Sequence, residues 1–142
     1  MYVNERHFQI AGVLHQIPAA CEFVARAAVQ AGLDEHAVYH CQLAVDEACT
    51  NIVEHGYELR GDNHVIDVVC REDAVRFTIL ILDDAPAFNP LTLPEPDPTA
   101  SLDARGSGGW GIHFIRKFMD EVSYSRDYHR NCLTLSKFKL TA

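Results

Sequence analysis

Long apolar runs and an excess of positive charge are both missing from this 142-residue chain. No stretch approaches the ~18 apolar residues that a membrane-spanning helix needs, and the first residues lack the pattern of a secretory signal. The 12 Lys and Arg residues are outnumbered by 20 Asp and Glu residues, which gives a formal net charge of −8. Because a grip on a phosphate backbone requires basic surface, we expect no direct nucleic-acid partner and no membrane contact.

Paired cysteines are missing as well. The five cysteines are odd in number, are scattered along the chain and form no C-x-x-C pair. This usage argues against a disulfide framework and is typical of reduced, buried thiols in a cytoplasmic protein. His36 and His40 have the i, i+4 spacing of a zinc pair, but no second ligand pair accompanies them. A solvated helix face is the simpler interpretation of these two histidines.

Apolar spacing divides the chain into extended and helical segments. Alternating apolar residues between 3 and 17 predict one or two short strands. Pro18 can open a helix that Gly32 ends, and Asp34 can cap a second, longer helix. The later segments comprise a predicted hairpin of two strands, a Pro- and Gly-rich stretch, a helix and two final strands: 64–71, 75–82, 83–109, 110–119, 121–126 and 131–140.

This order predicts a single domain, 1–142, of the α+β class. Two or three helices would pack against an antiparallel or mixed sheet of about five strands. Strands that follow one another along the chain, after an initial block of helices, argue against a doubly wound parallel sheet.

The second helix carries a polar pair at its apolar border. Glu47 and Asn51 are four residues apart, and His55 follows one turn later, so their side chains fall on one face of a regular helix. An acid beside a neutral oxygen donor suits a site that holds Mg²⁺ and manages a hydroxyl proton.

A second signal is Asp83, which ends the apolar run 77–82. A carboxylate only accepts hydrogen bonds, so it can bind the amino group of adenine and reject the keto oxygen of guanine. The alternative is that Asp83 and Asp84 merely begin a turn before Pro86.

The third signal is the glycine-rich segment 106–111, which satisfies G-x-G-x-x-G. A dinucleotide-binding fold needs a strand directly before such a segment, a P-loop needs Gly-Lys-Ser/Thr, and a protein-kinase glycine loop needs a lysine-bearing strand after it. None of these three features is present, and a helix comes next. What remains is a flexible loop leading into a helix N-terminus, which would suit a polyphosphate, or else a mobile surface loop.

Three segments resemble, in this order, the N, G1 and G2 boxes of the histidine-kinase-like (GHKL, Bergerat-fold) ATPases: 47–51, 83–90 and 106–111. The segments 43–51, 115–122 and 131–135 are similar to the small anti-sigma regulatory factors that act as serine-protein kinases. The resemblance implies a two-layer α/β sandwich, the Bergerat ATP-binding fold, with three helices on one sheet face. It also implies ATP and Mg²⁺ as cofactors.

Roles for individual residues follow from the resemblance. Asn51 would coordinate Mg²⁺, and Glu47 would be the general base or would orient the attacking hydroxyl. Asp83 would bind the adenine amino group with a water held by Thr134. His55 would reach a phosphate, although a structural histidine at a helix end is an equal alternative.

The same resemblance assigns the lid. Arg105 would contact the γ-phosphate, and the lid and its hinge would be formed by Gly106, Gly108 and Gly111. The chain departs from the pattern in G1, where Ala85 and Ala87 replace the usual glycines. Because alanine is less free in backbone conformation, we expect a tighter or reshaped pocket.

The implied function is a regulator that transfers the γ-phosphoryl group of ATP to a serine of a STAS-type anti-sigma-factor antagonist. A sigma factor would be the other partner, and a homodimer is implied too. One alternative is a nucleotide-dependent protein-binding module with little or no phosphotransfer. Another is a non-catalytic α+β domain in which Glu47 and Asn51 are only solvated.

Overall fold

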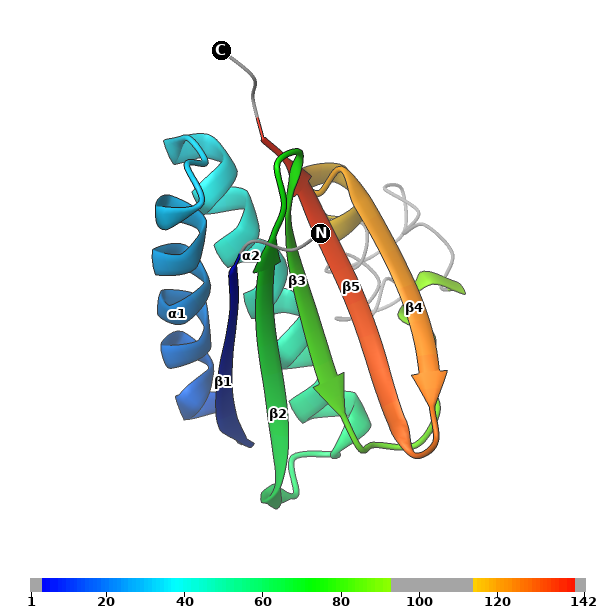
Figure 1. The fold of residues 1–142 in the computed structure, drawn as a ribbon. Coiled ribbons are helices and arrows are strands. Elements are labelled where there is room, and N and C mark those ends of the chain that lie inside the picture. Colours follow the sequence, from blue (N-terminus) through cyan, green and yellow to red (C-terminus); the bar gives the residue numbers. More distant parts are fainter. Residues whose placement is uncertain (1–3, 93–113, 140–142) are drawn as a thin grey trace, which may run out of the picture.

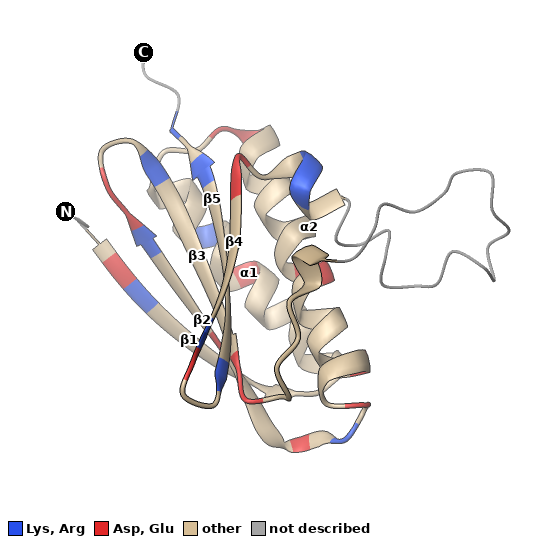
Figure 2. Ribbon diagram, turned by 90° about the vertical axis from the view of Figure 1, so that its right-hand side faces the viewer, with Lys and Arg blue, Asp and Glu red and all other residues tan. Residues whose placement is uncertain are grey.

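The computed structural model describes residues 4–92 and 114–139 of the chain. In these residues five strands form one antiparallel sheet in the order β1-β2-β3-β5-β4. Helices α1 and α2, together with the helical segment 114–118, cover one face of this sheet (Figure 1, Figure 2). The predicted two-layer α+β sandwich is therefore confirmed.

The bounds of the elements lie within a few residues of the predicted segments. The strands are β1 Asn4–Gly12, β2 Gly61–Glu72, β3 Arg76–Asp83, β4 Glu121–Asp127 and β5 Arg130–Phe138. The helices are α1 Ile17–Gln30 and α2 Glu35–Asn51. Three single turns complete the list: the 3-10 turns η1 Leu14–Gln16 and η3 Pro90–Thr92, and the π-helical turn η2 Ile52–Gly56.

Local signals set the ends of both long helices. Pro18 lies in the first turn of α1, where its missing N–H costs no helical hydrogen bond. Gly32 follows α1 with a φ of +91°, a conformation that favours glycine. The Asp34 side chain accepts a hydrogen bond of 2.8 Å from the backbone N–H of Ala37 and so caps α2.

The core lies between the helices and the sheet. Ile79 and Ile81 of β3 are fully buried against α2, which contributes Val45. Alternate residues of each strand point to the opposite, helix-free face, where Thr78 and Ser136 share a hydrogen bond of 3.1 Å. On β5 the residues with odd numbers therefore face the helices and those with even numbers face away.

The cysteines are free thiols, as expected. Cys41, Cys49 and Cys70 are buried, and burial raises the pKa of Cys41 and of Cys70 to about 12. Neutral, buried thiols of this kind serve as small apolar side chains.

One histidine departs from its predicted place on a solvated face. The His40 ring stacks on Phe118 at a centroid distance of 4.8 Å, and its Nδ1 lies 3.1 Å from Nζ of Lys137. His36 is exposed, as expected, and the described residues contain no cluster of three or more metal-ligating side chains. None of the helices in the described part of the chain has the length and apolar character of a membrane-spanning segment.

Candidate active site

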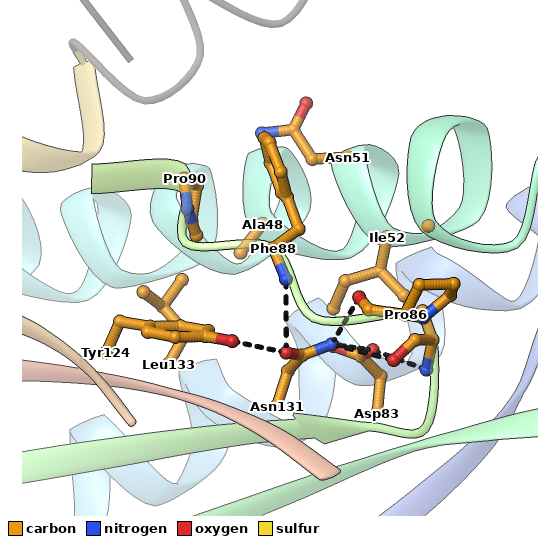
Figure 3. Close-up of a pocket in the computed structure, with 12 residues that line it drawn as sticks. Ala48, Asn51, Ile52, Asp83, Pro86, Phe88, Pro90, Tyr124, Asn131 and Leu133 are labelled. Atoms are coloured by element: carbon orange, nitrogen blue, oxygen red, sulfur yellow. Dashed lines mark hydrogen bonds between the residues drawn. The ribbon is translucent and has the colours of Figure 1, made fainter. Parts of the chain in front are cut away.

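A pocket opens between the C-terminal half of α2 and the edge of the sheet where β3 ends and β5 begins (Figure 3). Its empty volume, including the open mouth, is about 480 Å³. The residues that line it are Ala48, Asn51, Ile52, Gly56, Asp83, Ala85, Pro86, Phe88, Pro90, Tyr124, Asn131 and Leu133. Two residues predicted from separate motifs, Asn51 and Asp83, thus line one cavity.

Helix α2 supplies the polar pair predicted from the i, i+4 spacing. Asn51 is half-buried at the pocket, and Glu47, also half-buried, lies one turn earlier beside a neighbouring hollow lined by Phe114, Ile115 and Phe118. Among the described residues, neither side chain has a hydrogen-bonding partner. Within the described part of the chain, no side chain competes with a ligand for either group.

The charge state of Glu47 is shifted in the direction that a base requires. Burial raises the pKa of the Glu47 carboxyl above its usual range, and the nearby charges of Asp46 and Glu54 raise it further. A carboxylate with a raised pKa holds a proton more readily than an exposed glutamate.

His55 lies in a turn whose geometry differs from that of α2. The turn η2 is π-helical. The N–H of Tyr57, which follows the turn, donates to the carbonyl of Ile52, five residues earlier, at 2.7 Å. The wider turn brings Ile52 and Gly56 to the pocket and leaves His55 exposed. The alignment of His55 with Asn51 was predicted for a regular α-helix, from which this turn departs, and a phosphate contact by His55 stays a prediction.

Asp83 lies at the pocket floor and is only 6% exposed. Its Oδ1 accepts a hydrogen bond of 2.9 Å from the N–H of Ala85 and one of 3.0 Å from Nδ2 of Asn131. Burial raises the pKa of Asp83, while these two hydrogen bonds act in the opposite direction. No described residue donates to Oδ2, so this oxygen can accept a hydrogen bond from a bound ligand.

Asn131 is a site residue that sequence reasoning missed. It is 6% exposed, and Figure 3 shows it at the centre of the hydrogen bonds under the pocket. Its Nδ2 lies 3.0–3.2 Å from three acceptors: Asp83 Oδ1, Ala85 O and Pro86 O. Its Oδ1 accepts from Tyr124 Oη at 2.5 Å, Arg126 Nη1 at 2.9 Å and, weakly, Phe88 N at 3.4 Å.

Thr134 does not lie beside Asp83. It falls between the buried residues Leu133 and Leu135 of β5 and points to the helix-free face, where its hydroxyl lies 3.8 Å from Sγ of Cys132. The structure therefore does not bring Thr134 to Asp83, and its role in holding a water there stays a prediction. Asn131, three residues earlier and of the opposite parity, is the β5 side chain that contacts Asp83.

The two alanines that replace glycines fit their positions without strain. Neither Ala85 nor Ala87 is among the described residues with a positive φ. Ala85 is buried, and a Cβ added to Gly56 would come within 3.0 Å of the Ala85 Cβ. The methyl group of Ala85 thus packs close to Gly56 at the end of the π turn, and both residues line the pocket.

The predicted lid lies outside the described residues. Arg105, Gly106, Gly108 and Gly111 all fall in the segment 93–113, so their roles stay predictions.

Comparison with known proteins decides the family. Residues 10–137 match the model of the histidine kinase-like ATPase domain. The chain belongs to this family. The resemblance found in the three ordered motifs is thereby confirmed.

Several relatives carry the names of kinases. Over 94 residues the chain is 34% identical to the serine/threonine-protein kinase BtrW of Bordetella bronchiseptica, a match that covers 66% of each chain. It is 33% identical over 94 residues to the serine-protein kinase RsbW of Bacillus licheniformis, covering 61% of this chain and 56% of that protein. The serine-protein kinase RsbW of Staphylococcus aureus is 26% identical over 135 residues, a match that covers 87% of this chain and 83% of that protein. The chain thus spans slightly over half to about two thirds of the first two relatives.

A solved structure supports the fold. The RsbU and RsbW domains of a Mycobacterium tuberculosis protein match 99% of this chain and 34% of that chain, with a TM-score of 0.65. At 15% sequence identity this likeness concerns the fold alone.

Proposed function

We propose that this histidine kinase-like ATPase domain binds ATP with Mg²⁺ and transfers the γ-phosphoryl group to a serine of a protein partner. The observation that carries the proposal is the pairing of two groups across one pocket. Asp83 offers an oxygen without a described partner at the floor, and Asn51 offers a carboxamide without one on the facing helix. Glu47 follows one turn away on the same helix.

The residues fit the implied cofactors. Mg²⁺ prefers oxygen ligands and is usually held by few protein groups together with phosphates, which suits the single carboxamide oxygen of Asn51. The Asp83 carboxylate, as an acceptor without a donor, would select the amino group of adenine. Bound Mg²⁺ supplies neutralisation of the charge on the phosphates.

Glu47 would accept the proton of the serine hydroxyl. Its raised pKa favours proton acceptance, and its half-buried side chain lines the hollow at Phe114 and Phe118, where a protein substrate would reach it. Phosphoryl transfer depends mainly on positioning and charge neutralisation. One general base, one metal ligand and one carboxylate that binds adenine are therefore sufficient from this part of the chain.

We infer a STAS-type anti-sigma-factor antagonist as the serine substrate and a sigma factor as the second partner, acting with a homodimer of this chain. The motif resemblance and the kinase names of the relatives support this assignment. A nucleotide-dependent binding module with little phosphotransfer is the second candidate, and the methyl group of Ala85 in the pocket lining, where the family pattern has glycine, favours it.

Transfer of the γ-phosphate from labelled ATP to a STAS-type antagonist tests the two candidates. The kinase predicts transfer by the wild type, strong loss in Glu47→Gln and retained ATP affinity in that variant. Glu35→Gln is the matched control, since Glu35 is an exposed acid of the same helix whose charge is not among those that shift the pKa of Glu47. ATP binding without transfer by the wild type would establish the binding module instead.

A further inference from the structure

The loop that leaves β3 at Asp83 is held from below by one buried amide. Asn131 Nδ2 lies within 3.2 Å of the carbonyl oxygens of Ala85 and Pro86 as well as of Asp83 Oδ1. Arg126 also donates to the carbonyl of Ala85, at 3.1 Å. The loop therefore takes its position from side chains of β4 and β5 rather than from a glycine-rich backbone of its own.

The orientation of the Asn131 amide is fixed by its neighbours. Arg126 can only donate hydrogen bonds, so the group 2.9 Å from its Nη1 must be Oδ1 of Asn131. The amide nitrogen must then point to the loop carbonyls and to Asp83. Both ends of the amide are occupied, so Asn131 has no capacity left to bind a base itself.

We propose that Asn131 is a positioning residue for base recognition: it ties down Oδ1 of Asp83 so that Oδ2 alone is presented to the amino group of adenine. Tyr124 and Arg126 hold Asn131 in this orientation. The proposal rests on the proposed function, because it assigns to Asn131 a part in ATP binding. It adds a residue that none of the three sequence motifs contains.

A pH-dependent effect distinguishes this role from a structural one. The Asn131 hydrogen bond favours the charged form of Asp83 against the burial that raises its pKa. The other groups facing Asp83 are Asp84 on the same loop, Arg126 of β4, Cys49 of α2 and Tyr57 after η2. Removing the Asn131 donor raises the pKa of Asp83 further, so a larger share of Asp83 is protonated as the pH falls.

The test is the dissociation constant of ATP–Mg²⁺ for the wild type and Asn131→Leu, measured by calorimetry from about pH 8 down to the lowest pH at which both proteins stay folded. At each pH, the dissociation constant of the variant is divided by that of the wild type. This ratio cancels the titration of the nucleotide itself. We expect this ratio to rise as the pH falls, because Asp83 of the variant takes up its proton at a higher pH than Asp83 of the wild type. A ratio that does not depend on pH would overturn the proposal and leave Asn131 with a purely structural role.

Tyr124→Phe keeps the test decisive if Asn131→Leu does not fold. It removes only the hydroxyl that donates to Asn131 Oδ1, and we expect a smaller rise of the ratio in the same direction. A pH-independent ratio in this folded variant would overturn the proposal as well. Failure of the proposed function looks different, since the wild type itself would then not bind ATP at any pH.

Discussion

Asp83→Asn should invert the base preference of the pocket rather than merely weaken it. In the wild type, the N–H of Ala85 and Nδ2 of Asn131 both donate to Asp83 Oδ1. The new amide must keep its oxygen at these two donors. Its NH₂ group is then forced into the place of Oδ2, where a donor faces the amino group of adenine.

The magnitude follows from the hydrogen bond that is lost. A hydrogen bond to a charged group contributes about 1.5–3 kcal/mol, which corresponds to about 10- to 150-fold in affinity. We expect ATP–Mg²⁺ affinity to fall by this factor, while GTP–Mg²⁺ affinity rises because the new NH₂ can donate to the keto oxygen of guanine. Calorimetric titration of both nucleotides into both proteins measures the two changes.

The stability of the same variant provides an internal control. Burial raises the pKa of folded Asp83 above its unfolded value, so its contribution is favourable at low pH and is lost as the pH rises through the folded pKa. Asp83→Asn abolishes this loss, and its free energy of unfolding relative to wild type should increase with pH above about 4. Wild-type ATP affinity in the folded Asn variant, with GTP still excluded, would refute the reasoning.

Three further variants test other parts of the account. Thr134→Val should leave ATP affinity unchanged by calorimetry, because Thr134 points to the helix-free face; a large loss would restore its sequence-predicted role. Gly61→Ala should lower the free energy of urea unfolding by about 1–3 kcal/mol or more, since the new Cβ would lie 2.1 Å from the carbonyl oxygen of Gly12. Asp34→Ala should lower the free energy of unfolding by about 1 kcal/mol through the lost α2 cap, and Asp34→Ser should recover most of this loss. Equal stability of the Ala and Ser variants would contradict the capping role.

The sequence was informative wherever a local rule decides the structure. Pro18, Gly32 and Asp34 mark helix ends through backbone geometry and capping, and these ends were predicted correctly. Glu47 and Asn51 both lie within the regular helix α2, as their i, i+4 spacing assumed. Sheet order was not predicted, because insertion of β5 between β3 and β4 depends on contacts distant in sequence.

The errors arose where local geometry departed from the ideal or where strand parity was not applied. The π turn at 52–56 changes the rotation per residue, which apolar periodicity does not reveal, and so this turn was predicted as regular helix. For β5 the signal was present: Asn131 has the same parity as the core residues Leu133 and Leu135, so a buried polar group could have been inferred. Thr134 has the opposite parity.

The most direct test of the central claim is calorimetric titration of the wild type with ATP and with GTP, with and without Mg²⁺, alongside Asn51→Ala. Thr50→Ala, on the adjacent position of α2, is the matched control and lies outside the pocket lining. The account predicts that ATP binds more tightly than GTP, that Mg²⁺ strengthens the binding, and that Asn51→Ala loses this Mg²⁺-dependent part while the control keeps it. Absence of ATP binding, or equal binding of both nucleotides unaffected by Asn51→Ala, would contradict it.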